Sequence, residues 1–150
     1  QTEAYIRKLA NTYQYILESD KKQLIRLNEE IEFIKDYCYL INIRFGKAFK
    51  VHVDVDKSFS EYFIPPLSIQ ILVENAVKHN TMDIKNPLHI TIEVEDEHIC
   101  IKNNCTEAPN KVASFHIGLK NINERYLLLA DKGISITSGT HFCVKIPIIR

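Results

Sequence analysis

The chain has 150 residues, of which 45% are hydrophobic and 25% charged, the composition of a globular protein long enough to bury a sizeable core. Its 19 basic residues balance 19 acidic ones, which argues against a protein whose main task is to grip nucleic-acid backbone. No apolar run approaches the roughly 20 residues that a membrane-spanning helix needs. The four cysteines form no CxxC pair and have no histidines at metal-site spacing, so we expect reduced thiols.

Residues 1–45 carry two helical patterns, each with a narrow apolar stripe that repeats at steps of three and four residues. The first stripe consists of Ile6, Leu9, Tyr13 and Ile16. The second consists of Leu24, Leu27, Ile31, Ile34, Cys38, Ile41 and Phe45. We expect helices over about 1–19 and 28–45, with Asn28 as an N-cap and Gly46 as a stop. Such a stripe suits helix-on-helix packing, although the second helix fits the cover of a sheet equally well.

The remaining chain alternates strands and helices. Five strands are expected, at 49–55, 88–94, 98–103, 134–137 and 142–146. Helices are expected from the Pro65-Pro66 pair to about His79, and from Gly118 to just before Gly133. This order predicts an α+β fold, in which a mostly antiparallel sheet carries helices on one face.

The helix that follows Pro65 and Pro66 has an unusual polar edge. Asn75, Lys78 and His79 stand at i, i+3 and i+4, so they share a face about one turn long. An amide, an ammonium and an imidazole on one edge of an apolar helix suit a ligand that carries phosphate and a metal ion. The alternative is an amphipathic helix with a solvated face, on which Lys78 pairs with Glu74.

Five motifs occur in an order that resembles the ATP-binding domain of sensor histidine kinases, within the GHKL group of ATPases, and more closely the LytS type. They lie at residues 27–37, 43–46, 64–80, 118–125 and 144–147. The resemblance covers the whole chain. It implies a two-layer α/β sandwich of the Bergerat type at 46–150. It also implies that residues 1–45 are the helical tail of the dimerisation and phosphoacceptor region.

The resemblance also implies ligand roles for the polar edge of the asparagine helix. Asn75 matches the asparagine that coordinates the Mg²⁺ bridging the ATP phosphates, and an amide oxygen is a reasonable ligand for a hard cation. Lys78 matches a position that can reach phosphate as a point charge. His79 and Asn80 lie at the end of the helix that faces the nucleotide.

The opposite wall departs from the family pattern. Asn103 stands where the family has an aspartate that accepts a hydrogen bond from the adenine amino group. The asparagine replaces a charge-assisted hydrogen bond by a neutral one, which costs about 1 kcal/mol of binding free energy. Cys105 and His116 stand where the family has glycines, and only Gly118 remains. The helix after Gly118, which opens with Leu119, is expected to offer free N–H groups to the phosphates. We therefore expect weakened nucleotide binding.

The reaction implied is phosphoryl transfer rather than hydrolysis. Hydrolysing GHKL members carry a glutamate four residues before the asparagine, and here that position is Ile71, which cannot take a proton. None of the six histidines stands in the sequence context of a phosphoacceptor, so we expect the acceptor upstream of Gln1.

The sequence therefore predicts the Mg-ATP-binding catalytic domain of a two-component sensor histidine kinase. Its expected partners are a response regulator of the LytTR type and a second copy of the kinase, without direct binding to nucleic acid. We expect a cytoplasmic domain of a protein anchored in the inner membrane. The alternatives are a degenerate, non-catalytic dimer scaffold or signal relay, and a GHKL ATPase that hydrolyses ATP.

Overall fold

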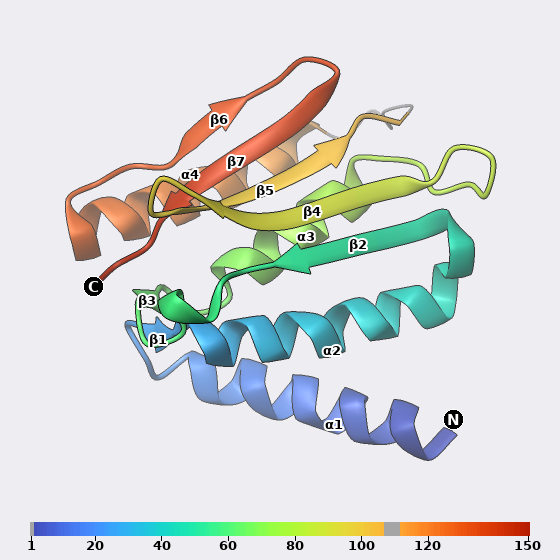
Figure 1. Cartoon of the computed structure of the whole chain (residues 1–150), viewed down its shortest axis with the longest axis horizontal. Coiled ribbons are helices and arrows are strands. Elements are labelled where there is room, and N and C mark those ends of the chain that lie inside the picture. The colour runs from blue at the N-terminus through green and yellow to red at the C-terminus, as the bar shows by residue number, and fades with distance from the viewer. Residues whose placement is uncertain (1, 107–111) are drawn as a thin grey trace.

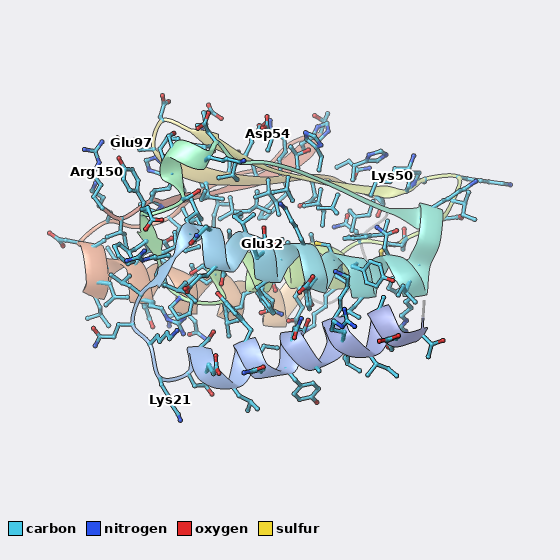
Figure 2. All side chains as sticks on the ribbon, turned by 60° about the horizontal axis from the view of Figure 1, so that its bottom comes forward. Lys21, Glu32, Lys50, Asp54, Glu97 and Arg150 are labelled. Atoms are coloured by element: carbon cyan, nitrogen blue, oxygen red, sulfur yellow. The ribbon has the colours of Figure 1, made fainter. Side chains whose placement is uncertain are left out.

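The computed structural model describes residues 2–106 and 112–150, and the side chains of these residues except those of 112–117 (Figure 1). Three helices cover one face of a five-stranded sheet: α2 (Leu27–Phe45), α3 (Ser68–Lys78) and α4 (Val112–Ala130). None of the described helices covers the other face, and Figure 2 shows Lys50 and Asp54 of β2 on it. Within the described residues, no helix is long and apolar enough to cross a membrane. The predicted α+β sandwich is confirmed.

The sheet is mixed. Its strands are β2 (Phe49–Asp54), β4 (Leu88–Glu95), β5 (His98–Asn104), β6 (Ser135–Thr137) and β7 (His141–Pro147). Their order is β2-β4-β5-β7-β6, with β2 and β4 parallel and the other neighbours antiparallel. Because parallel strands need a crossover, α3 lies in the connection between β2 and β4. All five strands lie close to their predicted positions.

The core fills the layer between the sheet and its three helices. The sheet contributes the alternate residues that face the helices, and the helices contribute their apolar stripes. Its most deeply buried members include Leu27, Ile34, Phe49, Ile69, Leu88, Ile90, Ile92, Ile99, Tyr126 and Ile146. The β4–β5 turn needs no glycine, because Asp96 and Glu97 themselves adopt positive φ values of 51° and 58°. This is the pattern of a type I′ hairpin turn.

The start of α2 differs from the prediction. Arg26 is the N-cap, and Asn28 lies inside the helix. Backbone carbonyls from the neighbouring loop do the capping, because the N–H groups of Leu27 and Asn28 donate to the oxygens of Tyr62 and Ser60 at 2.8 and 3.1 Å. A short pair of strands, β1 (Ile25–Arg26) and β3 (Phe63–Ile64), brings this loop into place. The predicted stop at Gly46 is confirmed, with φ 55°.

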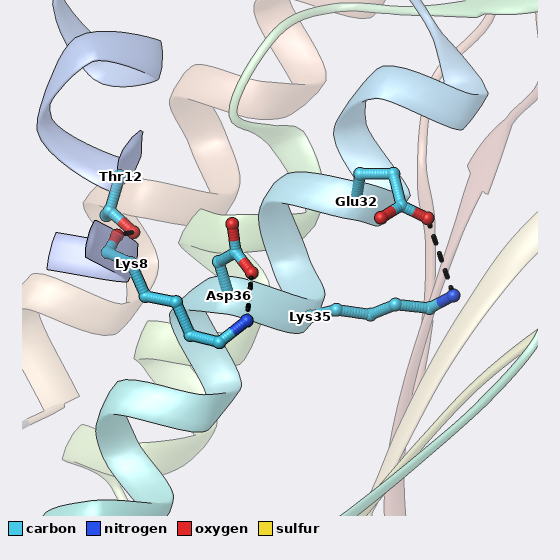
Figure 3. A network of polar contacts seen from close by, with 5 residues as sticks. All are labelled: Lys8, Thr12, Glu32, Lys35 and Asp36. Atoms are coloured by element: carbon cyan, nitrogen blue, oxygen red, sulfur yellow. Dashed lines mark hydrogen bonds and ion pairs between the residues drawn. The ribbon is translucent and has the colours of Figure 1, made fainter. Parts of the chain in front are cut away.

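Helix α1 (Thr2–Ser19) packs on the outer side of α2, away from the sheet (Figure 1). The contact includes a hydrogen-bonded ion pair at 2.9 Å between Lys8 Nζ and Asp36 Oδ1 (Figure 3), and a stack of Tyr15 on Phe33 with ring centroids 4.1 Å apart. The apolar stripe predicted for this helix mostly faces away from α2. Three of its four residues, Ile6, Leu9 and Tyr13, are exposed, whereas Ile16 packs against the core. Tyr5 and Leu17 of the same helix are exposed as well.

The start of α4 was predicted wrongly. The helix begins at Val112, six positions before Gly118, so that glycine lies in the helix interior. Residues 112–117 contain neither proline nor glycine, so nothing in them stops the helix from extending backwards. A glycine inside a helix costs about 1 kcal/mol relative to alanine, which tertiary packing readily offsets.

Candidate functional site

The side chain of Asn75 extends from α3 and lies against α4. Its side chain is 8% exposed, and its Nδ2 atom is buried with no hydrogen-bond partner among the described residues. Gly118 of α4 faces it so closely that a Cβ added there would lie 3.2 Å from Nδ2 and 3.5 Å from Oδ1. The structure thus brings together two predicted site residues that are 43 positions apart, and glycine permits the approach.

Lys78 is held by its own helix. Its Nζ lies 2.7 Å from Glu74 Oε1, and both side chains are partly exposed. Glu74 also accepts a hydrogen bond from Gln70 at 2.8 Å. The arrangement matches the alternative reading of this edge, an i,i+4 pair worth about 0.2–0.5 kcal/mol. Lys78 can leave such a weak pair for a ligand at little cost.

The chain just after α3 ties the helix to the end of β5. Asn80 donates from Nδ2 to the carbonyl of Ala76 at 2.9 Å and accepts at Oδ1 from the N–H of Thr106 at 3.0 Å. The Thr106 hydroxyl in turn donates to the carbonyl of Thr81 at 2.8 Å. His79 caps the helix, and its N–H donates to the Asn75 carbonyl at 3.0 Å. The Asn80 amide therefore holds the segment that follows β5, a role that the sequence prediction missed.

Asn103 lies on the helix-facing side of the sheet. It is 4% exposed and continues the inward row of Ile99 and Ile101 along β5. Its Nδ2 donates to the carbonyl of Asn104 at 2.8 Å, which orients the amide. The amide oxygen Oδ1 is a hydrogen-bond acceptor. The position suits the expected hydrogen-bond acceptor for an adenine amino group.

The expected N–H groups of Gly118 and Leu119 are not available. Both residues lie more than one turn inside α4, where each N–H faces a carbonyl of the preceding turn. Leu119 is also 5% exposed and packs in the core. Gly118 contributes through its closeness to Asn75 instead, and the expectation of a helix N-terminus at these two residues was wrong. The side chain of His116 lies outside the described residues.

Comparisons with known proteins point in one direction. A family model described as histidine kinase matches residues 1–49. The sensor protein kinase HptS of Staphylococcus aureus is 22% identical over 166 aligned positions, which cover 97% of this chain and 32% of HptS. The chain thus spans about a third of the length of the curated relatives it matches.

Solved structures add the decisive observation. The catalytic domain of the histidine kinase ThkA superimposes with a TM-score of 0.57 at 16% identity, over 83% of this chain and 93% of that domain. The fold is that of a sensor histidine kinase catalytic domain. A blue-light-activated histidine kinase of Erythrobacter litoralis gives a TM-score of 0.53 at 17% identity, over 97% of this chain and 53% of that one.

This histidine kinase fold implies a bound nucleotide, and the residues present would also fit a cation that accompanies its phosphates. Asn75 offers a neutral amide oxygen to a cation, and its buried Nδ2, which lacks a partner in the described part of the chain, can donate to a phosphate oxygen. Mg²⁺ in nucleotide sites takes one or two protein oxygens, with phosphates and waters completing its coordination. Among the described residues, no cluster of three or more His, Cys, Asp or Glu side chains is placed to hold a metal ion alone. The donor set therefore suits a cation that arrives with phosphate.

One buried acid of this fold escaped the sequence prediction. Glu30 of α2 is fully buried, and burial raises its pKa from 4.5 to about 7, against the opposing effect of hydrogen bonds to the charged form. The sequence prediction did not single it out. A signal was present, because Glu30 stands three residues after Leu27 and four before Ile34, on the buried stripe.

Proposed function

We propose that this chain binds Mg-ATP as the catalytic domain of a two-component sensor histidine kinase of the LytS type. In this proposal the γ-phosphate passes to a histidine outside these 150 residues and then to an aspartate of a response regulator. The observation that carries the proposal is the buried Nδ2 atom of Asn75, which lies against Gly118 and has no hydrogen-bond partner in the described residues. A buried polar group without a partner costs free energy, and a ligand can repay that cost.

Each residue of the site has a task in this proposal. The Asn75 amide oxygen binds the cation, which when present neutralises charge on the phosphates. Lys78 exchanges Glu74 for a phosphate oxygen, and Asn103 accepts from the adenine amino group. Ile71 presents a methyl group 3.7 Å from the Cβ position of Gly118. With no base there to activate water, transfer by positioning is favoured over hydrolysis.

The test is a thermal and chemical unfolding titration with Mg²⁺ and a non-hydrolysable ATP analogue. Ligand at ten times its Kd should raise the free energy of unfolding by about 1.4 kcal/mol. We expect Asn75→Asp to abolish this stabilisation, because it alters both the hydrogen bonding and the charge at the cation. Asn86→Asp is the matched control, since it makes the same charge change at an exposed loop position.

Two outcomes contradict the proposal. The first is an unfolding midpoint that does not rise at millimolar nucleotide in the wild-type chain. The second is equal stabilisation of the wild type and Asn75→Asp. Steady release of phosphate without any histidine acceptor would support a hydrolysing ATPase instead.

For the whole protein we propose two kinds of partner and a location. They are a response regulator, of the LytTR type, and a second copy of the kinase, with the domain on the cytoplasmic side of an inner-membrane anchor. A chain extended toward the N-terminus should become labelled on histidine with γ-labelled ATP and pass the label to the regulator. An extended chain that binds its regulator but stays unlabelled would favour the scaffold alternative.

The exposed stripe of α1 specifically favours the second copy. Tyr13 and Leu17 are 66% and 65% exposed, one turn apart on the side of the helix away from α2. Apolar side chains at this spacing suit pairing with another helix. Leu17→Glu should shift the extended chain toward monomer in light scattering. Ile84→Glu, at a loop site 68% exposed, should leave the mass unchanged.

A further inference from the structure

Glu30 joins three helices that are far apart in the sequence. Its Oε1 accepts hydrogen bonds from the Tyr15 hydroxyl of α1 and from the N–H of Leu67 at 3.2 Å. Its Oε2 accepts from the N–H of Ile69 at 3.3 Å. One carboxyl group of α2 therefore holds the packed helix α1 on one side and the first turn of α3 on the other.

The first turn of α3 depends on this outside acceptor. Pro65 and Pro66 precede the helix, and Leu67 is its N-cap with φ 66°, a left-handed conformation that is unusual for leucine. Leucine has no side-chain oxygen with which to accept from the exposed N–H groups of a helix start. Glu30 takes over that task, and its charge complements the positive end of the helix.

The same helix carries the candidate cation ligand. Asn75 lies six residues beyond Ile69, or about 9 Å along a helix that rises 1.5 Å per residue. Between them α3 is one continuous helix whose residues Leu72 and Val73 pack in the core, so we expect it to shift as a unit. A change in how its first turn is held is therefore transmitted to Asn75, whose amide lies against Gly118 with little free space.

We propose that Glu30 is a positioning residue for Asn75, through which the packing of α1 sets the position of the nucleotide-binding helix. Tyr15 is the contact by which α1 acts on Glu30. The nucleotide part of this inference rests on the proposed function, whereas the mechanical link does not. Through this link, the packing of α1, which precedes the catalytic domain, can affect the position of Asn75.

The groups around Glu30 determine the pH at which its carboxyl group takes up a proton. Tyr15 faces it from α1, and the peptide N–H groups of Leu67 and Ile69 face it from α3. From α4, the Arg125 guanidinium favours the charged carboxylate, and Arg125 also donates to the Pro66 carbonyl at 3.0 Å. The Tyr126 phenol, also from α4, has its pKa raised by burial and by the Glu30 charge. When Glu30 takes up a proton, one of its oxygens becomes a donor, and the hold on α3 weakens.

A nuclear magnetic resonance titration of the 150-residue chain from pH 5 to 9 tests the link without nucleotide. The backbone amides of Leu67 and Ile69 and the side-chain amide of Asn75 should shift together with a midpoint of about 7. Glu30→Gln should remove this common transition. Histidines titrate in the same range, so the Glu30→Gln spectra supply their baseline.

Tyr15→Phe keeps the carboxylate and removes only the contact from α1. Because the Tyr15 hydroxyl lowers the pKa of Glu30, its loss should move the midpoint to higher pH. Glu32→Gln and Tyr13→Phe are matched controls on exposed positions of the same two helices, and both should keep the wild-type midpoint. A transition at Leu67 and Ile69 without one at Asn75, or an unchanged midpoint in Tyr15→Phe, overturns the proposal.

A binding measurement separates this inference from the proposed function. Affinity for Mg²⁺ with the ATP analogue should fall about fivefold in Glu30→Gln, the effect of one weakened charge-assisted hydrogen bond, and should not change in Glu32→Gln. Equal affinity in the wild type and Glu30→Gln overturns the link to nucleotide and leaves the proposed function standing. A wild type that binds no nucleotide refutes the proposed function, while the titration still decides the mechanical link.

Discussion

Removal of the Glu30 charge should change how the stability of this chain depends on pH. Burial raises the pKa of Glu30 from 4.5 to about 7 in the folded chain, whereas the unfolded chain keeps the ordinary value. The folded state thus binds the proton more tightly. Its extra stability is fully present below pH 4.5 and is lost as the pH rises through 7.

The magnitude follows from these two values. The difference between a pKa of 4.5 and one of about 7 corresponds to about 3 kcal/mol, most of which is lost between pH 5 and 8. Glutamine does not titrate, so Glu30→Gln should lack this loss. The wild type should therefore lose about 2–3 kcal/mol relative to Glu30→Gln over that interval.

Urea unfolding at pH 5, 6, 7 and 8, followed by circular dichroism, measures the effect. The quantity to compare is the difference in unfolding free energy between wild type and Glu30→Gln, because pH effects of all other groups cancel in it. Glu32→Gln, whose carboxyl is 76% exposed, is the control and should run parallel to the wild type. The difference in unfolding free energy between wild type and Glu30→Gln could instead stay constant within about 0.5 kcal/mol across the series, which is about the error of such measurements. That result would refute the assignment of Glu30 as a buried, titrating acid.

Two further predictions concern the packing of the helices. Gly118→Ala should weaken nucleotide binding, because the added methyl group would lie 3.2 Å from Asn75 Nδ2 and press on that amide. An ATP-analogue titration measures this effect, and unchanged affinity contradicts the reasoning. A double-mutant cycle on the part-buried pair Lys8 and Asp36, measured by urea unfolding, should give a coupling energy of about 0.5–1 kcal/mol. The exposed pair Arg7 and Glu3 should give almost none. Equal coupling energies for the two pairs would show that burial is not the deciding factor.

Local features were accessible from the sequence because local physics decides them. The stripe through Leu27 and Ile34 marks the buried face of α2, since helical spacing alone places those side chains together. Gly46 ends the helix because its positive φ suits glycine. The alternation of apolar and polar residues marked the strands. The polar edge at Asn75 marked one wall of the candidate site.

The opposite wall shows the limit of such local arguments. Gly118 was expected at a helix start, but the helix extends back to Val112, and the glycine serves instead to admit the Asn75 amide. This contact is between α3 and α4, which the β4–β5 hairpin separates in the sequence. Periodicity does not define it, because it depends on how both helices pack on the sheet.

By itself, the sequence determined the class of fold and most element boundaries, and it marked the residues predicted for one wall of the candidate site, because propensity, period and capping act within a few residues. Only the tertiary structure decided that β2 and β4 are parallel, that α1 turns its apolar stripe outward, and that Glu30 is buried beneath Tyr15. These depend on contacts between distant segments. Their energies are set by burial and by hydrogen bonds that exist only once the chain has closed on itself.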